Sequence, residues 1–318
     1  MITTVTLNPA IDKIVEINNM ALGQVHRVSK KVVSLGGKSI NVARILSGLG
    51  SETKAICFAG EHNYEEISDY AKKDNIQLET ILVKGLTRTN VKVVEPDQNY
   101  RTTDINEQGF TISNEKLQEM VELIYSWGTK SDYLVLSGSL PKGVPKSFYK
   151  DIAIKLKDIT NVIIDADGEI LMAGIEGAPF LIKPNIDELE SALNKKLDSN
   201  EAIVKSCQEL IEQFKMNYIL VSMGADGSIL VGKDINLRAD VLPVQVLSTV
   251  GAGDSMLAGF IYGLTKFDKS EEETKLLKAL SYGVASSSIA ISTQDHKAIA
   301  ETELIAFATD VKINKIVI

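Results

Sequence analysis

The chain reads Ser248-Thr249-Val250-Gly251-Ala252-Gly253-Asp254-Ser255 between a strand-like run, Val244–Leu247, and an apolar segment, Met256–Leu264. A Gly-Ala-Gly turn between strand and helix directs backbone N–H groups at the positive end of the helix dipole, where anionic oxygens bind. An acid directly after the glycines would repel a phosphate that was merely bound. We therefore predict that Asp254 accepts a proton from an attacking hydroxyl, while the amides of Gly251–Gly253 stabilise a transferring phosphoryl group. The pattern alone also fits a plain helix start with an acidic first turn.

Short apolar runs and amphipathic segments alternate along the rest of the chain, which favours βαβ units and a parallel sheet with helices on both faces. The predicted strands are Ile2–Leu7, Lys54–Ala59, Leu78–Val83, Tyr133–Leu136, Asn161–Asp165, Phe180–Lys183 and Tyr218–Ser222. Helical spacing is found in Ile40–Leu49, Glu65–Lys73 and Glu115–Trp127.

Two stretches, Asp12–Ser34 and Thr89–Ile105, lack helical spacing and have the pattern of paired strands. In the second, Pro96-Asp97-Gln98-Asn99 is a turn signal between two strand-like runs. We predict that the two stretches join in space as a small accessory sheet. The alternative is that both are edge strands of the main sheet.

Composition excludes several classes of protein. The chain has 318 residues, 44% of them hydrophobic, which allows two domains or one large domain with an appendage. A formal charge of −8 argues against a nucleic-acid partner, and two cysteines, Cys57 and Cys207, supply neither a disulfide framework nor a cysteine zinc cluster. Residues 1–12 do not resemble a signal peptide, and no apolar stretch approaches the roughly 18 residues of a membrane helix. We expect a cytoplasmic protein that does not bind membranes.

Two motifs near the N-terminus have the residue types of a sugar site. In Gly36-Gly37-Lys38-Ser39-Ile40-Asn41 the glycines allow close approach of a ligand, Lys38 can reach a phosphate, and Asn41 can hold a hydroxyl. The spacing is not that of a Walker A loop, and a capped helix with a solvated Lys38 is the alternative interpretation. Asp12 follows the first strand and can accept two hydrogen bonds from a sugar diol, although the sequence alone favours a turn-capping role.

The segment Lys183-Pro184-Asn185-Ile186-Asp187-Glu188 begins a helix after a strand. Asn185 and Glu188 lie on one helical face, and a carboxylate with an amide suits a hydrated Mg²⁺. The same pair is also typical of a capping box, and both interpretations can hold together.

Three further segments are weaker signals. Val221–Ser228 predicts a hairpin with a glycine turn, and Ser137–Pro141 ends a buried strand with small residues. Arg88 and Arg101 could together hold a phosphate, although single arginines are more often solvated surface charges.

The motifs are more specific as an ordered set. Asn-Pro-Ala with Asp12, Gly-Gly-Lys with Asn-Val-Ala, Ser-Gly-Ser-Leu-Pro, Lys-Pro-Asn-x-x-Glu, Ser-x-Gly-Ala-x-Gly and Gly-Ala-Gly-Asp follow one another. This set resembles the PfkB (ribokinase-like) sugar kinase family over essentially the whole chain. The Thr-Leu-Asn-Pro-Ala opening, the Thr-Arg-Thr-Asn-Val-Lys stretch and Thr103–Gly109 are most similar to its 1-phosphofructokinase and tagatose-6-phosphate kinase branch.

The resemblance implies a ribokinase-like α/β fold: one domain, residues 1–318, with a three-layer α/β/α body, a mostly parallel sheet and a small β-sheet lid. Two insertions, about 12–34 and 88–106, would form the lid. It also implies ATP, Mg²⁺ and a ketohexose phosphate acceptor, with fructose 1-phosphate favoured and tagatose 6-phosphate or fructose 6-phosphate as alternatives. A non-catalytic sugar-phosphate sensor on the same fold is a further alternative, which the retained Asp254 opposes. Lid strands with an exposed edge favour a homodimer through the lid.

Site roles follow from the resemblance residue by residue. Asp254 matches the catalytic base, and Gly251, Ala252 and Gly253 match the anion hole. The predicted substrate residues are Asp12, Gly37, Lys38, Asn41, Arg88, Asn90, Arg101 and Ser139. The predicted nucleotide residues are Lys183, Asn185, Ser222, Gly224, Gly227 and Thr249, with Glu188 for the metal. Ser39 replaces a customary glycine, and Ser248 stands where relatives often have Asn or Asp, which weakens any inference of a monovalent-cation site.

Overall fold

A ten-stranded sheet forms the centre of the computed structural model, which describes residues 1–98, 100–293 and 298–317. Its strand order is β14-β13-β12-β11-β10-β9-β8-β1-β4-β5. The parallel strands are β1 (Ile2–Thr6), β4 (Thr53–Gly60), β5 (Leu78–Val83), β8 (Tyr133–Ser137), β9 (Asn161–Asp165), β10 (Leu181–Ile182) and β11 (Tyr218–Ser222). Three antiparallel strands extend one edge: β12 (Ser228–Gly232), β13 (Asn236–Ala239) and β14 (Ile313–Lys315).

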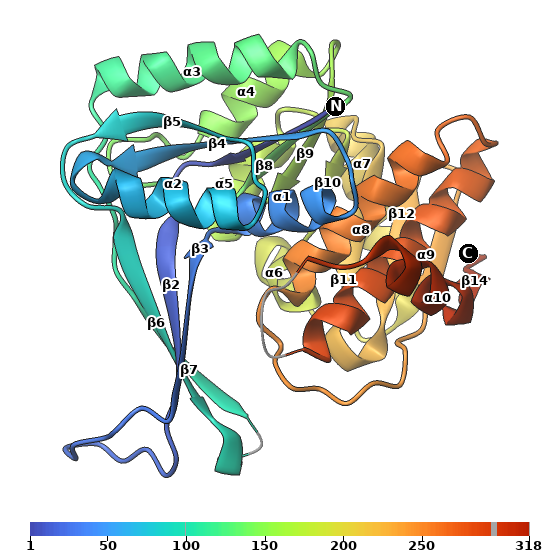
Figure 1. Cartoon of the computed structure of the whole chain (residues 1–318). Helices are drawn as coiled ribbons and strands as arrows, with labels where there is room; N and C mark the ends of the chain where they lie inside the picture. The colour runs from blue at the N-terminus through green and yellow to red at the C-terminus, as the bar shows by residue number, and fades with distance from the viewer. Residues whose placement is uncertain (99, 294–297, 318) are drawn as a thin grey trace.

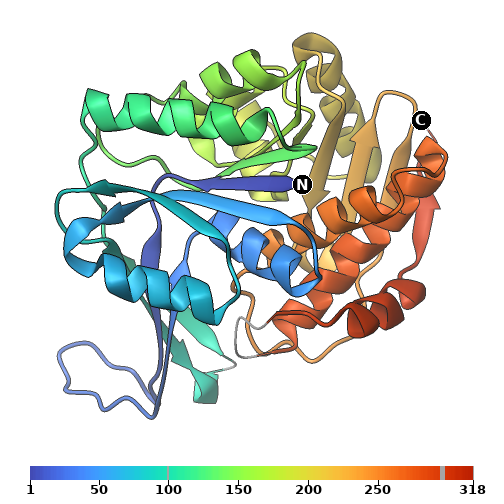
Figure 2. The same ribbon diagram turned by 45° about the horizontal axis from the view of Figure 1, so that its top comes forward.

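Helices cover both faces of this sheet, as Figures 1 and 2 show. One face carries α3 (Asn114–Gly128), α4 (Phe148–Leu156), α5 (Gly168–Ile175), α6 (Ile186–Leu193) and α7 (Asn200–Phe214). The other carries α1 (Lys38–Gly48), α2 (Tyr64–Lys73), α8 (Ala252–Lys266), α9 (Glu272–Ile291) and α10 (Glu301–Asp310). Short 3₁₀ turns are η1 (Glu61–Asn63), η2 (Pro96–Gln98) and η3 (Gly224–Asp226).

Side-chain alternation explains why both faces are covered. In β8, Leu134 and Leu136 pack with the first set of helices, whereas Tyr133 and Val135 pack with the second. Successive side chains of a strand point to opposite faces, so an all-apolar strand needs a helical layer on each side. The predicted α/β/α fold with a mostly parallel sheet is confirmed.

A second, four-stranded sheet projects from the body in Figure 1. Its order is β3-β2-β6-β7, from β2 (Ala10–Glu16), β3 (Lys30–Gly36), β6 (Arg88–Glu95) and β7 (Arg101–Asn106). We call it the small sheet. Parallel pairing of β2 with β6 joins the two segments and sets Asp12 opposite Asn90. These strands are therefore not edges of the main sheet. The predicted turn over 96–99 is η2, with Asn99 outside the described residues.

The predicted strand Val244–Leu247 is wrong. These residues lie in an irregular connection between β13 and α8. The amides of Leu247 and Ser248 donate to the carbonyl of Ile291 at the end of α9, at 2.8 and 3.2 Å. Their hydrogen bonds are thus made to a helix end rather than to a neighbouring strand, and β-branched composition alone does not reveal that. Among the described residues, no helix is long and apolar enough to cross a membrane.

Candidate active site

The carboxyl ends of the parallel strands open into one cleft of about 700 Å³ that the small sheet partly walls. Loops meet there because parallel strands all end at the same edge of their sheet. Most of the predicted residues line this cleft: Asp12, Gly37, Lys38, Asn41, Arg88, Asn90, Ser139, Lys183, Asn185, Glu188, Ser222, Thr249, Gly251, Ala252, Gly253 and Asp254.

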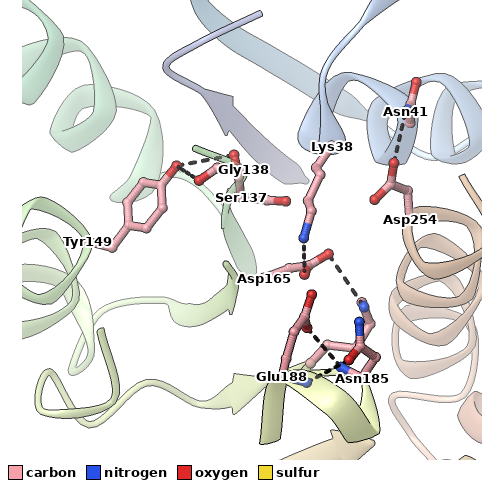
Figure 3. Close-up of polar contacts among 10 residues, drawn as sticks. Lys38, Asn41, Ser137, Gly138, Tyr149, Asp165, Asn185, Glu188 and Asp254 are labelled. Carbon is pink, nitrogen blue, oxygen red and sulfur yellow. Dashed lines mark hydrogen bonds and ion pairs between the residues drawn. The ribbon is translucent and has the colours of Figure 1, made fainter. Parts of the chain in front are cut away.

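Asp254 lies in the first turn of α8, and its carboxylate is almost fully buried at the cleft wall. The helix begins after Gly251, whose φ of 73° is in the left-handed region that favours glycine. Asn41 Nδ2 donates to Asp254 Oδ2 at 2.7 Å, and the second carboxylate oxygen points toward the side of the cleft where Lys38 lies (Figure 3). Burial first, and the charge of Asp165 second, raise the pKa of Asp254 to about 6. A carboxylate with that pKa is ionised at neutral pH yet basic enough to take a proton.

Asp165, at the end of β9, forms ion pairs with two lysines in the cleft, and Figure 3 shows the pair with Lys38. Lys38 Nζ lies 3.1 Å from its Oδ1, and Lys183 Nζ lies 3.6 Å from its Oδ2. Burial opposes the charge on Asp165, but the two ammonium groups outweigh it and hold the pKa of this carboxyl below its usual value. Burial likewise opposes the charge on Lys38, yet Asp165, Asp254 and Glu188 raise its pKa. Lys38 therefore remains cationic across the working pH range.

Lys183 also faces the start of α8. A Cβ added at Gly253 would lie 3.2 Å from Lys183 Nζ, so the ammonium group is next to the helix amides. The Lys183 ammonium group and the amides at the start of α8 thus converge on one point of the cleft, which is an arrangement that binds phosphate.

Asn185 and Glu188 form the predicted capping box at the start of α6. Asn185 Oδ1 accepts from the amide of Glu188 at 2.8 Å, and Glu188 Oε2 accepts from the amide of Asn185 at 2.9 Å. The other Glu188 oxygen is not used by the cap. No group of three His, Cys, Asp or Glu side chains suited to a metal occurs within the described residues. The Glu188 oxygen that the cap leaves unused fits Mg²⁺, which takes few protein oxygens together with phosphates and water.

The opposite end of the cleft is rich in neutral polar groups. Asn90 Nδ2 donates to Asp12 Oδ1 at 3.0 Å, and Asn8 Nδ2 donates to Ser139 Oγ at 3.2 Å. Within the described chain, the Oδ1 atoms of Asn8 and Asn90 are buried without a hydrogen-bond partner. Burial raises the pKa of Asp12. Unused buried acceptors at a cleft wall fit a ligand with several hydroxyl groups.

Arg88 belongs to the same end of the cleft, but Arg101 does not. The Arg88 guanidinium donates to three backbone carbonyls, those of Asn8, Pro9 and Glu107. Arg101 pairs instead with Glu95 through two bonds of 2.7 and 2.8 Å, and it is opposite Glu95 in the small sheet. Seven residues along β6 separate the two positions by about 23 Å. The prediction that Arg88 and Arg101 together hold one phosphate is therefore wrong, because both side chains would have to reach the same place.

Gly224 and Gly227 also lie outside the cleft lining. They have φ values of 57° and 91° in the turn between β11 and β12. A Cβ at Gly227 would lie 2.2 Å from the carbonyl oxygen of Ala239. Both glycines shape the hairpin that places Ser222 at the cleft.

Residues 5–303 match the family described as pfkB family carbohydrate kinase. This chain belongs to that family. It is 37% identical over 277 residues to 1-phosphofructokinase of Bacillus subtilis, covering 87% of this chain and 89% of that protein. It is 34% identical over 293 residues to 1-phosphofructokinase of Escherichia coli K12, covering 92% and 93%. The structure of E. coli phosphofructokinase-2 in complex with fructose-6-phosphate superposes with a TM-score of 0.85 at 25% identity, covering 97% and 98%.

Several residues of the kinase cleft were not anticipated: Asn8, Lys92, Asp104, Asn106, Asp165 and Asp167. Asp165 had a usable signal, since an acid ends the predicted strand Asn161–Asp165 at the edge where ligands collect. Lys92 and Asp104 form an ion pair of 2.7 Å across β6 and β7, which depends on strand register and has no local signal.

Proposed function

We propose that this PfkB kinase phosphorylates fructose 1-phosphate to fructose 1,6-bisphosphate with ATP. The names of the two curated relatives support this acceptor. The observation that carries the chemistry is Asp254, a buried carboxylate with a raised pKa beside the amides of α8 and Lys183. A base and an anion site within one cleft are what phosphoryl transfer to a hydroxyl requires.

The acceptor hydroxyl is held against the free oxygen of Asp254, which takes its proton as the sugar oxygen attacks the γ-phosphorus. The new oxygen–phosphorus bond forms as the bond to the β-phosphate oxygen breaks, and ADP leaves. The amides of Gly251–Gly253 and the ammonium of Lys183 hold the transferring phosphoryl group. Glu188 is the side chain that would hold Mg²⁺, which when bound would neutralise charge on the phosphate oxygens. Most of the remaining acceleration comes from positioning.

The sugar phosphate occupies the end of the cleft near the small sheet. Asp12 and the unused acceptors of Asn8 and Asn90 suit its hydroxyls. Arg88 and Lys92 supply positive charge for its phosphate. The nucleotide would lie beside Ser222 and Thr249, at the other end.

The small sheet acts in this proposal as a lid that closes over the sugar and limits wasteful ATP hydrolysis. It also pairs with a second copy of the chain. Every residue of β7 is exposed, and Leu22 and Val25 at the tip are 94% and 90% exposed. An open strand edge with apolar residues favours association. Light scattering of the purified protein should show a dimer, and a strict monomer at assay concentrations would contradict the pairing.

A cytoplasmic setting is part of the same proposal, and both cysteines are free and buried. In such a reducing compartment thiols stay unpaired.

The substrate is tested by coupled ADP release with fructose 1-phosphate, tagatose 6-phosphate, fructose 6-phosphate and the free sugars. We expect the highest kcat/KM with fructose 1-phosphate. Fructose 6-phosphate is the necessary competitor, because a solved relative is in complex with it. A higher kcat/KM with tagatose 6-phosphate or fructose 6-phosphate would show that this sugar phosphate, and not fructose 1-phosphate, is the acceptor. ATP binding without turnover on any sugar would indicate a non-catalytic sensor. Asp254→Asn serves as the inactive control in each assay.

A further inference from the structure

Arg44 is a buried arginine one turn beyond Asn41 on α1, and its side chain is only 3% exposed. Its three nitrogens all have partners. Nε donates to Asp74 Oδ2 at 2.8 Å, Nη1 donates to Asn41 Oδ1 at 2.6 Å, and Nη2 donates to the carbonyl of Leu35. A buried ion pair is weak evidence for a purely stabilising role, because desolvation offsets much of the attraction. The guanidinium is therefore worth considering for what it does to Asn41.

Asn41 stands between a group that can only donate and a group that can only accept. A guanidinium has no acceptor atom, and an ionised carboxylate has no donor. Only one orientation of the Asn41 amide satisfies both neighbours: Oδ1 toward Arg44 and Nδ2 toward Asp254. The flipped amide would face its NH₂ to the guanidinium and its oxygen to the carboxylate, with repulsion at both ends.

We propose that Arg44 is a positioning residue for phosphoryl transfer: it locks the Asn41 amide, which in turn fixes the Asp254 carboxylate with one oxygen free for the acceptor hydroxyl. This inference rests on the proposed kinase chemistry but not on which sugar phosphate is used. Arg44 does not touch the reacting atoms, and it acts through the amide of Asn41.

The Arg44 guanidinium also connects Asn41, and through it Asp254, to two other elements of the fold. Leu35 is the second-last residue of β3, at the root of the small sheet, and Asp74 caps the end of α2. Asn41 is thus held at a position set by the lid root and by α2 as well as by α1. A rigid second layer of this kind keeps reacting groups within the narrow geometry that transfer requires.

The pKa of Asp254 can report on this role, because it is measured as the acid limb of the pH profile of kcat. The groups that face it are Asp165 from β9, Lys183 from the segment after β10, and Lys38 and Asn41 from α1. The Asn41 hydrogen bond lowers the pKa of Asp254, against burial and Asp165, which raise it. If the Asn41 amide is no longer held, this hydrogen bond weakens and the pKa of Asp254 rises. The acid limb of the pH profile of kcat should then move to higher pH.

The central test is a double-mutant cycle of Arg44→Met and Asn41→Ala, measured with the best sugar phosphate of the wild-type enzyme. Arg44→Met alone should lower kcat about 10- to 100-fold with the KM for ATP essentially unchanged. In the Asn41→Ala background the same substitution should change kcat little, because its target is already gone. Fully additive losses in kcat would overturn the proposal, as would a folded Arg44→Met enzyme with wild-type kcat and acid limb.

Removal of a buried arginine can also prevent folding, so a second pair of variants tests the same point. Asp74→Ala keeps Arg44 and Asn41 but frees the guanidinium, and Asp69→Ala removes an exposed aspartate from the same helix. Asp74→Ala should lower kcat and move the acid limb upward, whereas Asp69→Ala should change neither. Equal kcat in the two variants, with equal thermal midpoints, would overturn the role. A wild-type enzyme without turnover on any sugar phosphate would instead refute the proposed function.

Discussion

Asp254→Asn should produce two opposite effects, a loss of turnover and a gain of thermal stability. The substitution keeps the shape of the side chain and an oxygen that can accept from Asn41, but it removes the charge and the basicity. A general base contributes about 10²- to 10⁴-fold to the rate. We expect a loss of kcat in that range, with ATP binding retained because Lys183 and the α8 amides are intact.

The stability gain follows from the pKa. Folding raises the pKa of Asp254 from 3.8 to about 6, so the charged side chain destabilises the folded protein. Two pKa units correspond to about 3 kcal/mol at pH 7.5, and about half of that remains at pH 5. Because the folded pKa is raised, the penalty is complete above about 6 and disappears as pH falls toward the unfolded value. A neutral asparagine avoids it, so the thermal midpoint should rise by about 4 °C at pH 7.5.

The assay is thermal unfolding of wild type and Asp254→Asn without substrates at pH 7.5 and pH 5, together with coupled ADP release. Contributions of the amide that do not depend on pH cancel when the two pH values are compared. A difference in midpoint that is the same at both pH values would refute the buried-charge reasoning. Turnover within tenfold of wild type would refute the role of Asp254 as the base.

Three further substitutions separate positions inside the cleft from positions beside it. Arg88→Ala should raise the KM for the sugar phosphate about tenfold or more, whereas Arg101→Ala should leave it unchanged in steady-state kinetics; equal effects would indicate that both arginines hold the phosphate. Gly109→Ala should raise the same KM, because its Cβ would lie 2.2 Å from Asn8 Oδ1 at a φ of 86°, and a crystal structure with Asn8 unmoved would contradict this. Tyr149→Phe removes a buried hydroxyl that donates to two backbone carbonyls at the end of β8 (Figure 3), and denaturant titration should show a loss of about 1–2 kcal/mol with little change in kcat.

Features with a local cause could be predicted from the sequence. Asn185 and Glu188 are three residues apart, so their capping box follows from helix geometry alone. The position of Asp254 after the Gly-Ala-Gly turn has the same local origin. The parallel body follows from apolar runs that alternate with helical spacing, because each run must be covered on both faces.

Features that depend on tertiary contacts could not be predicted. Asp165 matters because Lys38 and Lys183 approach it from distant segments, and no spacing in the chain encodes that meeting. Arg101, like Arg88, is a single arginine in a predicted strand region, but the strand register places it opposite Glu95. Arg44 directly follows the Asn-Val-Ala motif, yet its contacts with Leu35, Asn41 and Asp74 become visible only in the structure.

If the two substrates bind as proposed, the order of strands in the sheet also separates their contact residues along the chain. The cleft residues assigned to the sugar phosphate then lie between Asn8 and Ser139, whereas those assigned to the phosphate donor lie between Asp165 and Asp254. Lys38 and Asn41 connect the two sets of residues, through contacts with Asp165 and Asp254 respectively. Acceptor preference can therefore change through substitution or recombination in the first half of the chain while the donor half is inherited intact. A fold wound in this order is suited to diversify over many sugars while it keeps one phosphate donor.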